Sequence, residues 1–298
     1  MCGIVGLFLK DKSLQPQLGA MLSEMLISMT DRGPDSAGIA IYGPATPGRA
    51  KVTIQSQSPQ SDFAGLAAEL RKKIGVEVKV AVNSTHAVID VPSDRIDATR
   101  AALGEIRPSI RVMGSGDNVE IYKEVGLPGD VVDRFGLSKM IGTHGIGHTR
   151  MATESAVTTM GAHPFSTGPD QCLVHNGSLS NHNNVRRELK REGMKFETEN
   201  DTEVAAAYLS SKMAHGMKLG EALEHTLGDL DGFFTFVVGT KSGFGVVRDP
   251  IACKPAVLAE TDQYVAFGSE YRALAMLPGI ENAKVWEPEP ATVYFWEH

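Results

Sequence analysis

Met1-Cys2-Gly3-Ile4-Val5-Gly6-Leu7-Phe8 begins the chain and predicts the strand around which the rest of the fold is organised. The run is apolar, β-branched in part and bounded by glycines, a pattern typical of a buried strand. It also places a cysteine next to the initiator methionine. If Met1 is removed, Cys2 carries a thiol and a free α-amino group, and free α-amino groups titrate near neutral pH. One residue then supplies both a nucleophile and its general base.

Two simpler interpretations of Cys2 stand beside this one. Cys2 is equally suited to be a small buried hydrophobic residue in an edge strand. If Met1 is retained, the α-amino base is lost, and the chain is then a regulatory or scaffolding protein. The residues downstream decide which interpretation to prefer.

Composition excludes several classes of protein. The chain has 298 residues and a net charge of −7, with no basic stripe, so nucleic acid is not an expected partner. No apolar run approaches the roughly 20 residues that a membrane helix requires, and the first run is too short and lacks the basic leader of a signal peptide. The three cysteines are widely spaced and odd in number (Cys2, Cys172 and Cys253), which favours a reducing compartment. We expect a cytoplasmic protein with no membrane partner.

Hydrophobic periodicity predicts helices and strands in separate batches. Residues 16–29 have the spacing of an amphipathic helix, and 36–42 that of a strand. Further helices are expected at 127–135, 181–192, 201–214, 219–230 and 270–277, and further strands at 119–124, 171–174, 233–239, 244–248, 256–260, 264–268 and 291–296. Asn200-Asp201-Thr202-Glu203 has the pattern of a capping box. This order is typical of an α+β fold with largely antiparallel pairing.

Residues 50–117 have a pattern of their own. Strands are expected at 51–57, 76–83, 86–91 and 110–113, and helices at 61–74 and 93–106, the second with Ser93 as its N-cap. The order βαββαβ predicts a ferredoxin-like subdomain inserted into a domain that spans 2–298. The alternative is a set of extra strands on the main sheet. His86 is a lone histidine in a strand pattern, for which a structural role is expected.

The remaining polar motifs suggest what an N-terminal cysteine would attack. Cleavage of an amide needs donors for the oxyanion, and Asn176-Gly177 offers a side-chain N–H and an unhindered backbone N–H. Arg150 offers a planar fork suited to a carboxylate, and Asp201 offers a countercharge to an ammonium group. A carboxylate and an ammonium group on one small molecule describe an amino acid. The amide is then in its side chain, which indicates glutamine.

Each of these motifs has an ordinary structural explanation, as a turn, a surface ion pair or a helix cap. Together with Cys2 they resemble, in order and over most of the chain, the class II glutamine amidotransferases of the N-terminal nucleophile hydrolase superfamily. The matching segments are Cys2-Gly3-Ile4-Val5-Gly6, Arg32-Gly33-Pro34-Asp35-Ser36-Ala37-Gly38, His148-Thr149-Arg150, Ala152-Thr153, His163-Pro164, His175-Asn176-Gly177, Asp201-Thr202-Glu203, Arg248-Asp249-Pro250 and Lys254-Pro255.

The resemblance implies a four-layer αββα sandwich and a glutaminase half-reaction that passes through a γ-glutamyl thioester. The implied roles are these: Cys2 is nucleophile and, through its amine, base; Asn176 and Gly177 form the oxyanion hole; Arg150 holds the α-carboxylate and Asp201 the α-amino group; Thr153 and His163 line the pocket; Arg32 supports the terminus. No metal is implied.

The resemblance is strongest to the separate amidotransferase subunits of glutamate-synthase-like complexes, especially the small subunit of N-methylglutamate synthase. The chain shows no phosphate-binding glycine loop, flavin motif or cysteine cluster, so no cofactor is expected in it. In the resembled complexes a partner subunit binds FMN and an iron–sulfur cluster, and a further glutamate-synthase-like subunit completes the assembly. The nitrogen acceptor, 2-oxoglutarate or methylamine in exchange with glutamate, stays open.

Two rival hydrolases remain to be compared with this interpretation. One is a metal hydrolase that uses His144, His148, His163 and His175. Glycines between the first two make a shared helix face improbable, and carboxylates at ligand spacing are missing. The other is a cysteine hydrolase of a different amide, as in penicillin acylase-like proteins. The pairing of Arg150 with Asp201 argues against it.

Overall fold

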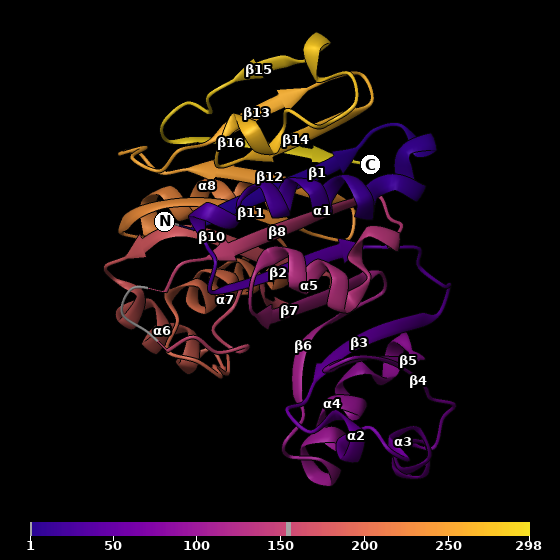
Figure 1. Cartoon of the computed structure of the whole chain (residues 1–298). Helices are drawn as coiled ribbons and strands as arrows, with labels where there is room; N and C mark the ends of the chain where they lie inside the picture. Colours follow the sequence, from indigo (N-terminus) through magenta and orange to yellow (C-terminus); the bar gives the residue numbers. More distant parts are fainter. Residues whose placement is uncertain (1, 153–155) are drawn as a thin grey trace.

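The computed structural model describes residues 2–152 and 156–298, and Figure 1 shows how its elements are arranged. The strands are β1 (Gly3–Leu9), β2 (Ser36–Tyr42), β3 (Arg49–Gln55), β4 (Lys79–Asn83), β5 (His86–Pro92), β6 (Arg111–Gly116), β7 (Val119–Val125), β8 (His144–Arg150), β9 (Phe165–Gly168), β10 (Gln171–Leu179), β11 (Gly232–Gly239), β12 (Gly243–Arg248), β13 (Val257–Glu260), β14 (Tyr264–Gly268), β15 (Lys284–Trp286) and β16 (Thr292–Glu297). The α-helices are α1 (Leu18–Ser28), α2 (Pro59–Asp62), α3 (Leu66–Ile74), α4 (Ile96–Ile106), α5 (Pro128–Phe135), α6 (His182–Arg191), α7 (Asp201–Ala214) and α8 (Leu219–Asp229). None of the helices in the described ranges is long and apolar enough to cross a lipid bilayer.

The N-terminal strand lies in the middle of the largest sheet. This sheet has seven strands in the order β15-β13-β14-β1-β8-β2-β7, and β1 pairs antiparallel with both β14 and β8. Side chains alternate along β1. Val5 and Leu7 belong to the core that includes α1, whereas Ile4 and Phe8 belong to the core between the sheets. Burial on both faces accounts for the unbroken apolar run.

A second sheet of five strands has the order β16-β12-β11-β10-β9. Leu173 and Phe236 pack on one side of it, against α6, α7 and α8. Val174 and Val237 lie on the other side, in the core that faces the first sheet. The two sheets thus pack face to face, with helices outside each of them (Figure 1). The pairing between the described strands of both sheets is antiparallel, so this part of the sequence prediction is confirmed.

The segment 49–116 forms a separate four-stranded sheet with the order β4-β5-β3-β6. In Figure 1 it lies at one corner of the molecule, with α2, α3 and α4. Its own core contains residues from both longer helices and from the strands, among them Leu66 and Leu70 of α3 and Leu103 of α4. A self-contained core of this kind is what a small domain needs in order to fold as a unit.

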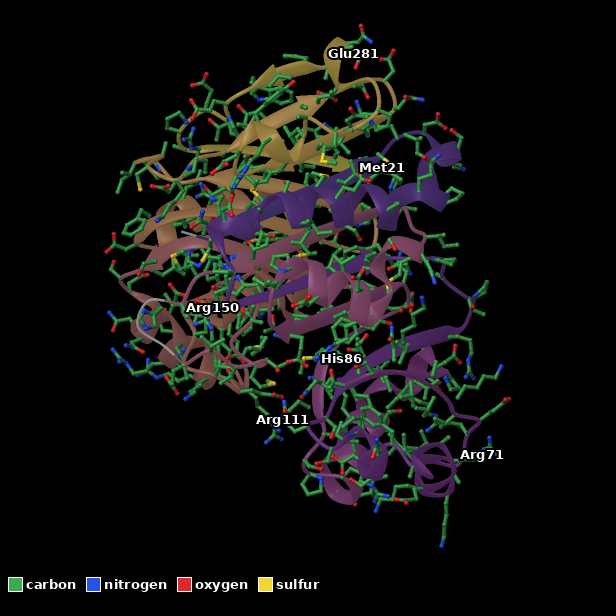
Figure 2. The ribbon with its side chains drawn as sticks, in the orientation of Figure 1. Met21, Arg71, His86, Arg111, Arg150 and Glu281 are labelled. Atoms are coloured by element: carbon green, nitrogen blue, oxygen red, sulfur yellow. The ribbon has the colours of Figure 1, made fainter. Side chains whose placement is uncertain are left out.

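The segment contacts the main body through polar side chains and one aromatic cluster. Lys51 forms an ion pair with Glu120 of β7 at 2.7 Å. His86 is fully buried at this junction (Figure 2) and its ring lies edge-on to Phe135, 4.8 Å between centroids. Burial lowers the pKa of His86 to about 3, so it is neutral. These contacts fit a structural histidine.

Three local predictions are wrong. Gly65, at φ +70°, interrupts the helix expected at 61–74 and divides it into α2 and α3. Ser93 does not cap α4, because residues 93–95 form a 3-10 turn and the helix begins at Ile96. The helix expected at 270–277 is only the 3-10 turn Tyr271–Ala273.

Candidate active site

Cys2 lies directly before β1, with its backbone held from two sides. Its carbonyl oxygen accepts hydrogen bonds from Arg32 Nε at 2.9 Å and from Asn176 Nδ2 at 3.2 Å. Its sulfur is 3.8 Å from the carbonyl oxygen of Met151. The carbonyl of the candidate nucleophile is therefore fixed by two side chains from distant parts of the sequence.

Arg32 connects the backbone of Cys2 to a charged cluster. Its Nη1 donates to Glu270 Oε1 at 2.6 Å, and Glu270 also pairs with Arg272 at 2.8 Å. The hydrogen bond from Arg32, assisted by the charge of Arg272, lowers the pKa of the Glu270 carboxyl. Arg32 is 7% exposed and lies behind Cys2. Its contact with the backbone of Cys2 is the contact that a supporting residue would make.

Asn176 and Gly177 lie near the end of β10, which continues to Leu179 instead of ending at Val174 as the sequence predicts. Gly177 has φ +151°, and a Cβ atom there would lie 2.0 Å from the carbonyl oxygen of Phe233. Only glycine fits this position. The side-chain amide of Asn176 and the backbone of Gly177 thus lie next to each other, beside Cys2.

Arg150 is the last residue of β8 and is 6% exposed (labelled in Figure 2). Its Nη1 donates to the carbonyl oxygen of Ala156 at 3.3 Å. Asp35 fixes the chain directly after it, on both sides of Met151. The Asp35 N–H donates to the Arg150 carbonyl at 3.0 Å, and its carboxylate accepts from the Ala152 N–H at 2.7 Å. Thr153, which the resemblance places in the pocket, lies outside the described residues.

Asp201 is the first residue of α7. Its carboxylate accepts a hydrogen bond from the Leu179 N–H at 2.9 Å and so ties the start of the helix to the end of β10. Asn200 caps the helix through a hydrogen bond from the Thr202 N–H at 2.8 Å. A carboxylate in the first turn of a helix is stabilised by the helix dipole. The negative charge of Asp201 is thereby held at the wall of the site.

The second half of the predicted capping box is wrong. Glu203 does not bind the N–H of the cap residue. Its carboxylate accepts instead from the N–H groups of Glu197 and Thr198, at 2.8 Å each. The sequence pattern cannot distinguish these bonds, because both satisfy the same carboxylate with backbone donors. Glu203 fixes the loop before α7.

Three buried histidines form a network beneath these residues. The ring of His148 stacks on that of His163, 4.0 Å between centroids, and its Nε2 lies 3.1 Å from the His175 carbonyl oxygen. His163 Nδ1 accepts from the His175 N–H at 3.3 Å. The Thr202 hydroxyl lies 3.3 Å from His163 Nε2 and 3.0 Å from His175 Nδ1. The network joins β8, β10 and α7.

These contacts assign the tautomers of two rings. His163 accepts at Nδ1, so its proton is on Nε2 and is donated to the Thr202 hydroxyl. The hydroxyl then donates to the nearer of its two acceptors, His175 Nδ1 at 3.0 Å rather than Asp201 Oδ1 at 3.5 Å, which leaves the proton of His175 on Nε2. Burial, together with the neighbouring histidines, holds the pKa of His163 well below its usual range, and burial lowers that of His148 to about 3. Burial also lowers the pKa of His175, although Asp201 opposes this shift.

The four histidines of the rival metal hydrolase do not converge. His144 lies apart from the other three, with its Nε2 2.8 Å from the Thr240 carbonyl oxygen. Within the described ranges, no group of three or more His, Cys, Asp or Glu side chains is arranged to hold a metal ion. The geometry favours the cysteine interpretation.

A cavity of about 910 Å³ connects the predicted site residues. Six of them line it: Cys2, Arg150, His163, Asn176, Gly177 and Asp201. Phe233 and Lys254 also line it, and the Lys254 ammonium group lies 4.9 Å from the centre of the Phe233 ring. Lys254 belongs to a segment that matches the resembled family, whereas no feature of the sequence singles out Phe233. The cavity is thus lined by a thiol, two amide groups, two cations (Arg150 and Lys254) and two carboxylates (Asp201 and Glu199).

Comparison with protein families gives an independent result. A family described as "Glutamine amidotransferase domain" matches residues 148–276. The chain is 73% identical over 298 residues to the glutamine amidotransferase-like protein GlxB of Rhizobium meliloti (strain 1021), covering 100% of this chain and 99% of that protein. It is 35% identical over 309 residues to a putative glutamine amidotransferase of Methanothermobacter thermautotrophicus, covering 99% of each.

A solved structure gives the same fold at low sequence identity. The glutamine phosphoribosylpyrophosphate amidotransferase of B. subtilis matches 99% of this chain with a TM-score of 0.62 and 20% identity, and this chain spans 47% of the length of that enzyme. At this identity the match establishes the fold alone. The two relatives that match over almost their whole length establish the family, and this chain belongs to the glutamine amidotransferases.

Proposed function

We propose that this chain releases ammonia from the side-chain amide of glutamine, with Cys2 as the nucleophile. The observation that carries the proposal is the single cavity that Cys2 shares with Asn176, Gly177, Arg150 and Asp201. These groups are what the reaction requires at its two ends. One end needs a nucleophile beside oxyanion donors, and the other needs partners for a carboxylate and an ammonium group.

The reaction proceeds in two balanced steps. In the first step the Cys2 sulfur attacks the side-chain carbonyl carbon, and the oxyanion accepts hydrogen bonds from Asn176 Nδ2 and the Gly177 N–H. The thiol proton passes through the α-amino group to the amide nitrogen, which leaves as ammonia. In the second step water attacks the γ-glutamyl thioester, and glutamate leaves as the thiol is restored. This scheme requires a chain that begins at Cys2.

Recognition of glutamine is assigned to charged groups at the far end of the cavity. Arg150 binds the α-carboxylate and Asp201 the α-amino group, while His163, as a neutral ring, forms part of the wall. The Arg150→Ala variant is expected to raise the KM for glutamine at least tenfold. Unchanged turnover of glutamine in this variant would favour a hydrolase of some other amide.

We assign the fold to the four-layer αββα sandwich of the N-terminal nucleophile hydrolases, with segment 50–117 as a ferredoxin-like insertion. Support comes from the two packed sheets with helices outside each, and from the strand order β4-β5-β3-β6 in the insertion. The first strand of the segment, β3, and the third, β5, lie next to each other at the centre of this sheet, as expected for a split βαβ unit.

We infer that the ammonia is used by a partner subunit in a cytoplasmic, glutamate-synthase-like complex, of which N-methylglutamate synthase is the nearest resemblance. The partner would carry FMN and an iron–sulfur cluster, and a further glutamate-synthase-like subunit would complete the assembly. Support comes from the sequence resemblance. Isolation of the tagged chain from its native cell, followed by flavin and iron analysis of the co-purified proteins, tests this assignment.

The alternative is a chain that keeps the fold and serves the complex without catalysis. A glutaminase assay of the purified chain distinguishes the two. Glutamate and ammonia are expected in equal amounts from the parent chain, and neither is expected from the Cys2→Ala variant. The exposed Cys253 is the matched control, because Cys253→Ala should retain full activity. An inactive parent, with and without its co-purified partners, would establish the alternative.

A further inference from the structure

Lys123 is a buried cation that the mechanism above does not use. It lies on β7, the edge strand of the seven-stranded sheet, and is 3% exposed. Its ammonium group donates to three backbone carbonyl oxygens: Ala162 at 2.8 Å, Pro164 at 3.1 Å and Met160 at 3.5 Å. An ammonium group has three donors, so all of them serve one short loop.

This loop is a wall of the glutamine cavity. Met160, Gly161 and His163 line the cavity, and two of the Lys123 acceptors are the carbonyls on either side of His163. The loop also lies tightly on the sheet. A Cβ atom at Gly38 of β2 would be 2.1 Å from the His163 carbonyl oxygen.

The other side of the same loop is not filled. A smaller cavity of about 240 Å³ lies there, and Met160 lines both cavities. Lys123 itself lines the smaller cavity, where its ammonium group is 4.5 Å from the centre of the Phe165 ring. Because the loop 160–164 has a cavity on each side, its position depends on the hydrogen bonds that hold it. The three hydrogen bonds from Lys123 hold it in this way, and we call them tethers.

We propose that Lys123 is a positioning residue of the glutamine site, which holds the loop 160–164 so that His163 and its neighbours fit the bound substrate. The proposal rests on the proposed function, because it concerns the affinity of that site for glutamine. Lys123 touches neither Cys2 nor the cavity of about 910 Å³ directly. It acts through the backbone of the loop.

The charge state of Lys123 gives the proposal a distinctive pH dependence. Burial lowers the pKa of Lys123 to about 8, although the carboxylates of Glu203 on α7 and Glu197 before it oppose the shift. His163 and His86, which face Lys123 from the loop and from β5, are neutral. Above pH 8 the ammonium group becomes an amine with two donors, so one tether is lost. Affinity for glutamine should therefore fall above pH 8.

Folding stability should change in the opposite direction. Between pH 8 and the ordinary lysine pKa of about 10.4, the unfolded chain binds this proton and the folded chain does not. The contribution of Lys123 to the free energy of unfolding therefore rises over this range. Weaker binding of glutamine above pH 8 therefore cannot be explained by unfolding of the chain when Lys123 loses its proton.

The test measures glutamine affinity in the Cys2→Ala background, where no turnover occurs, by calorimetry from pH 7 to 9.5. Lys123→Met should weaken binding roughly tenfold at pH 7. The ratio of its Kd to that of the parent should shrink above pH 8, since only the parent then loses a tether. This ratio cancels the titration of glutamine itself. Lys123→Arg, which stays charged, should bind within about threefold of the parent and without the step at pH 8.

Lys51→Met is the matched control, because it removes another lysine contact, with Glu120, away from the loop. Its Kd should equal that of the parent. A Lys123→Met Kd within twofold of the parent, or a ratio that does not change across pH 8, would overturn the proposal. If Lys123→Met does not fold, the proposal is tested by comparing the Kd for glutamine of the parent and of Lys123→Arg from pH 7 to 9.5. A rise in the Kd of the parent relative to Lys123→Arg above pH 8 supports the proposal, and a constant ratio overturns it.

Hydrogen exchange distinguishes failure of this proposal from failure of the proposed function. Lys123→Met should speed exchange of backbone amides in residues 157–165, and Lys51→Met should not. If the parent binds no glutamine, the proposed function has failed, and exchange still shows whether Lys123 holds the loop. Equal exchange in parent and Lys123→Met would overturn the tethering itself.

Discussion

At the residue scale, the contacts around Cys2 separate the support of the proposed nucleophile from the lining of the cavity. Arg32 and Asn176 both donate to the carbonyl oxygen of Cys2, from segments that are distant in sequence. Asn176 also faces the cavity, whereas Arg32 contacts the glutamate–arginine cluster behind it. Substitution of Arg32 should therefore disturb the nucleophile without removing a contact to glutamine.

We predict that Arg32→Met lowers kcat roughly 10- to 100-fold while the Kd for glutamine stays within about threefold. The reason is that the variant loses the hydrogen bond to the Cys2 carbonyl but leaves the far end of the cavity intact. Steady-state kinetics and calorimetry measure the two quantities. Arg272→Met is the control, since Arg272 also pairs with Glu270 but does not touch Cys2. A large rise in Kd in Arg32→Met would contradict this separation of roles.

The buried histidines predict loss of stability in mild acid. Burial lowers the pKa of His86, His144 and His148 to about 3, against about 6.5 in an unfolded chain. The unfolded state binds more protons between these values, so the free energy of unfolding falls as the pH falls from about 6.5 toward 3. Above pH 6.5 this contribution is fully present.

The urea midpoint should therefore be lower at pH 5 than at pH 7.5, and His144→Asn should make this difference smaller. His144 is suited to the test because it is buried but lies away from the cavity. The exposed His215 is the control, and His215→Asn should leave the difference unchanged. Equal differences in the parent and in His144→Asn would show that His144 does not titrate in this way.

At the scale of elements, the sequence predicts strands better than it predicts where they end. β10 extends five residues beyond its expected end at Val174, because it continues to pair with β11 through His175-Asn176-Gly177. The polar residues of this motif hide the strand pattern. The sequence analysis also misses three strands. The glycines and polar residues of β8 hide its strand pattern, and β9 and β15 have only four and three residues. The helix expected at 270–277 is reduced to the 3-10 turn Tyr271–Ala273, whose N-cap residue Glu270 makes no capping hydrogen bond.

Gly177 lies near the end of β10 and is assigned to the proposed oxyanion hole. Gly177 has a φ of +151°, and an added Cβ atom would lie 2.0 Å from the Phe233 carbonyl oxygen. We therefore predict that Gly177→Ala lowers the free energy of unfolding by roughly 2–4 kcal/mol and lowers glutaminase activity at least about 100-fold. Denaturant unfolding and steady-state assays measure the two effects. Gly193→Ala is the control, because Gly193 also has a positive φ, +94°, but a Cβ atom added there would meet nothing within 4 Å. That variant should lose about 1 kcal/mol and keep its activity.

At the scale of the whole molecule, the sequence predicts which segments carry the candidate site but not how they meet. Motifs in order along the chain identify Cys2, Arg150, Asn176 and Asp201, because each has a recognisable polar pattern. Lys123 has none. It is one lysine in a strand, and its importance depends on which loop the fold brings to it. Long-range packing of this kind is not encoded in a local pattern.

Segment 49–116 provides a test of the proposed domain organisation. Residues 49–116 have their own sheet and a core that includes Leu66, Leu70 and Leu103. We expect the isolated segment 46–118 to fold and to unfold cooperatively on heating, as followed by circular dichroism. The variant Leu70→Asp should abolish the transition, since Leu70 is fully buried. A segment without a cooperative transition would mean that this part folds only on the main body.

The central claim is that Cys2 is a processed nucleophile in a working glutamine pocket. The most direct test is the intact mass of the purified chain before and after treatment with the glutamine-shaped electrophile diazo-oxo-norleucine, followed by peptide mapping. We predict loss of Met1 and a single adduct on Cys2, with no adduct on Cys172 or Cys253, and protection by excess glutamine. Retained Met1 and no adduct would contradict the claim and leave a chain with the fold of an amidotransferase and no glutaminase activity.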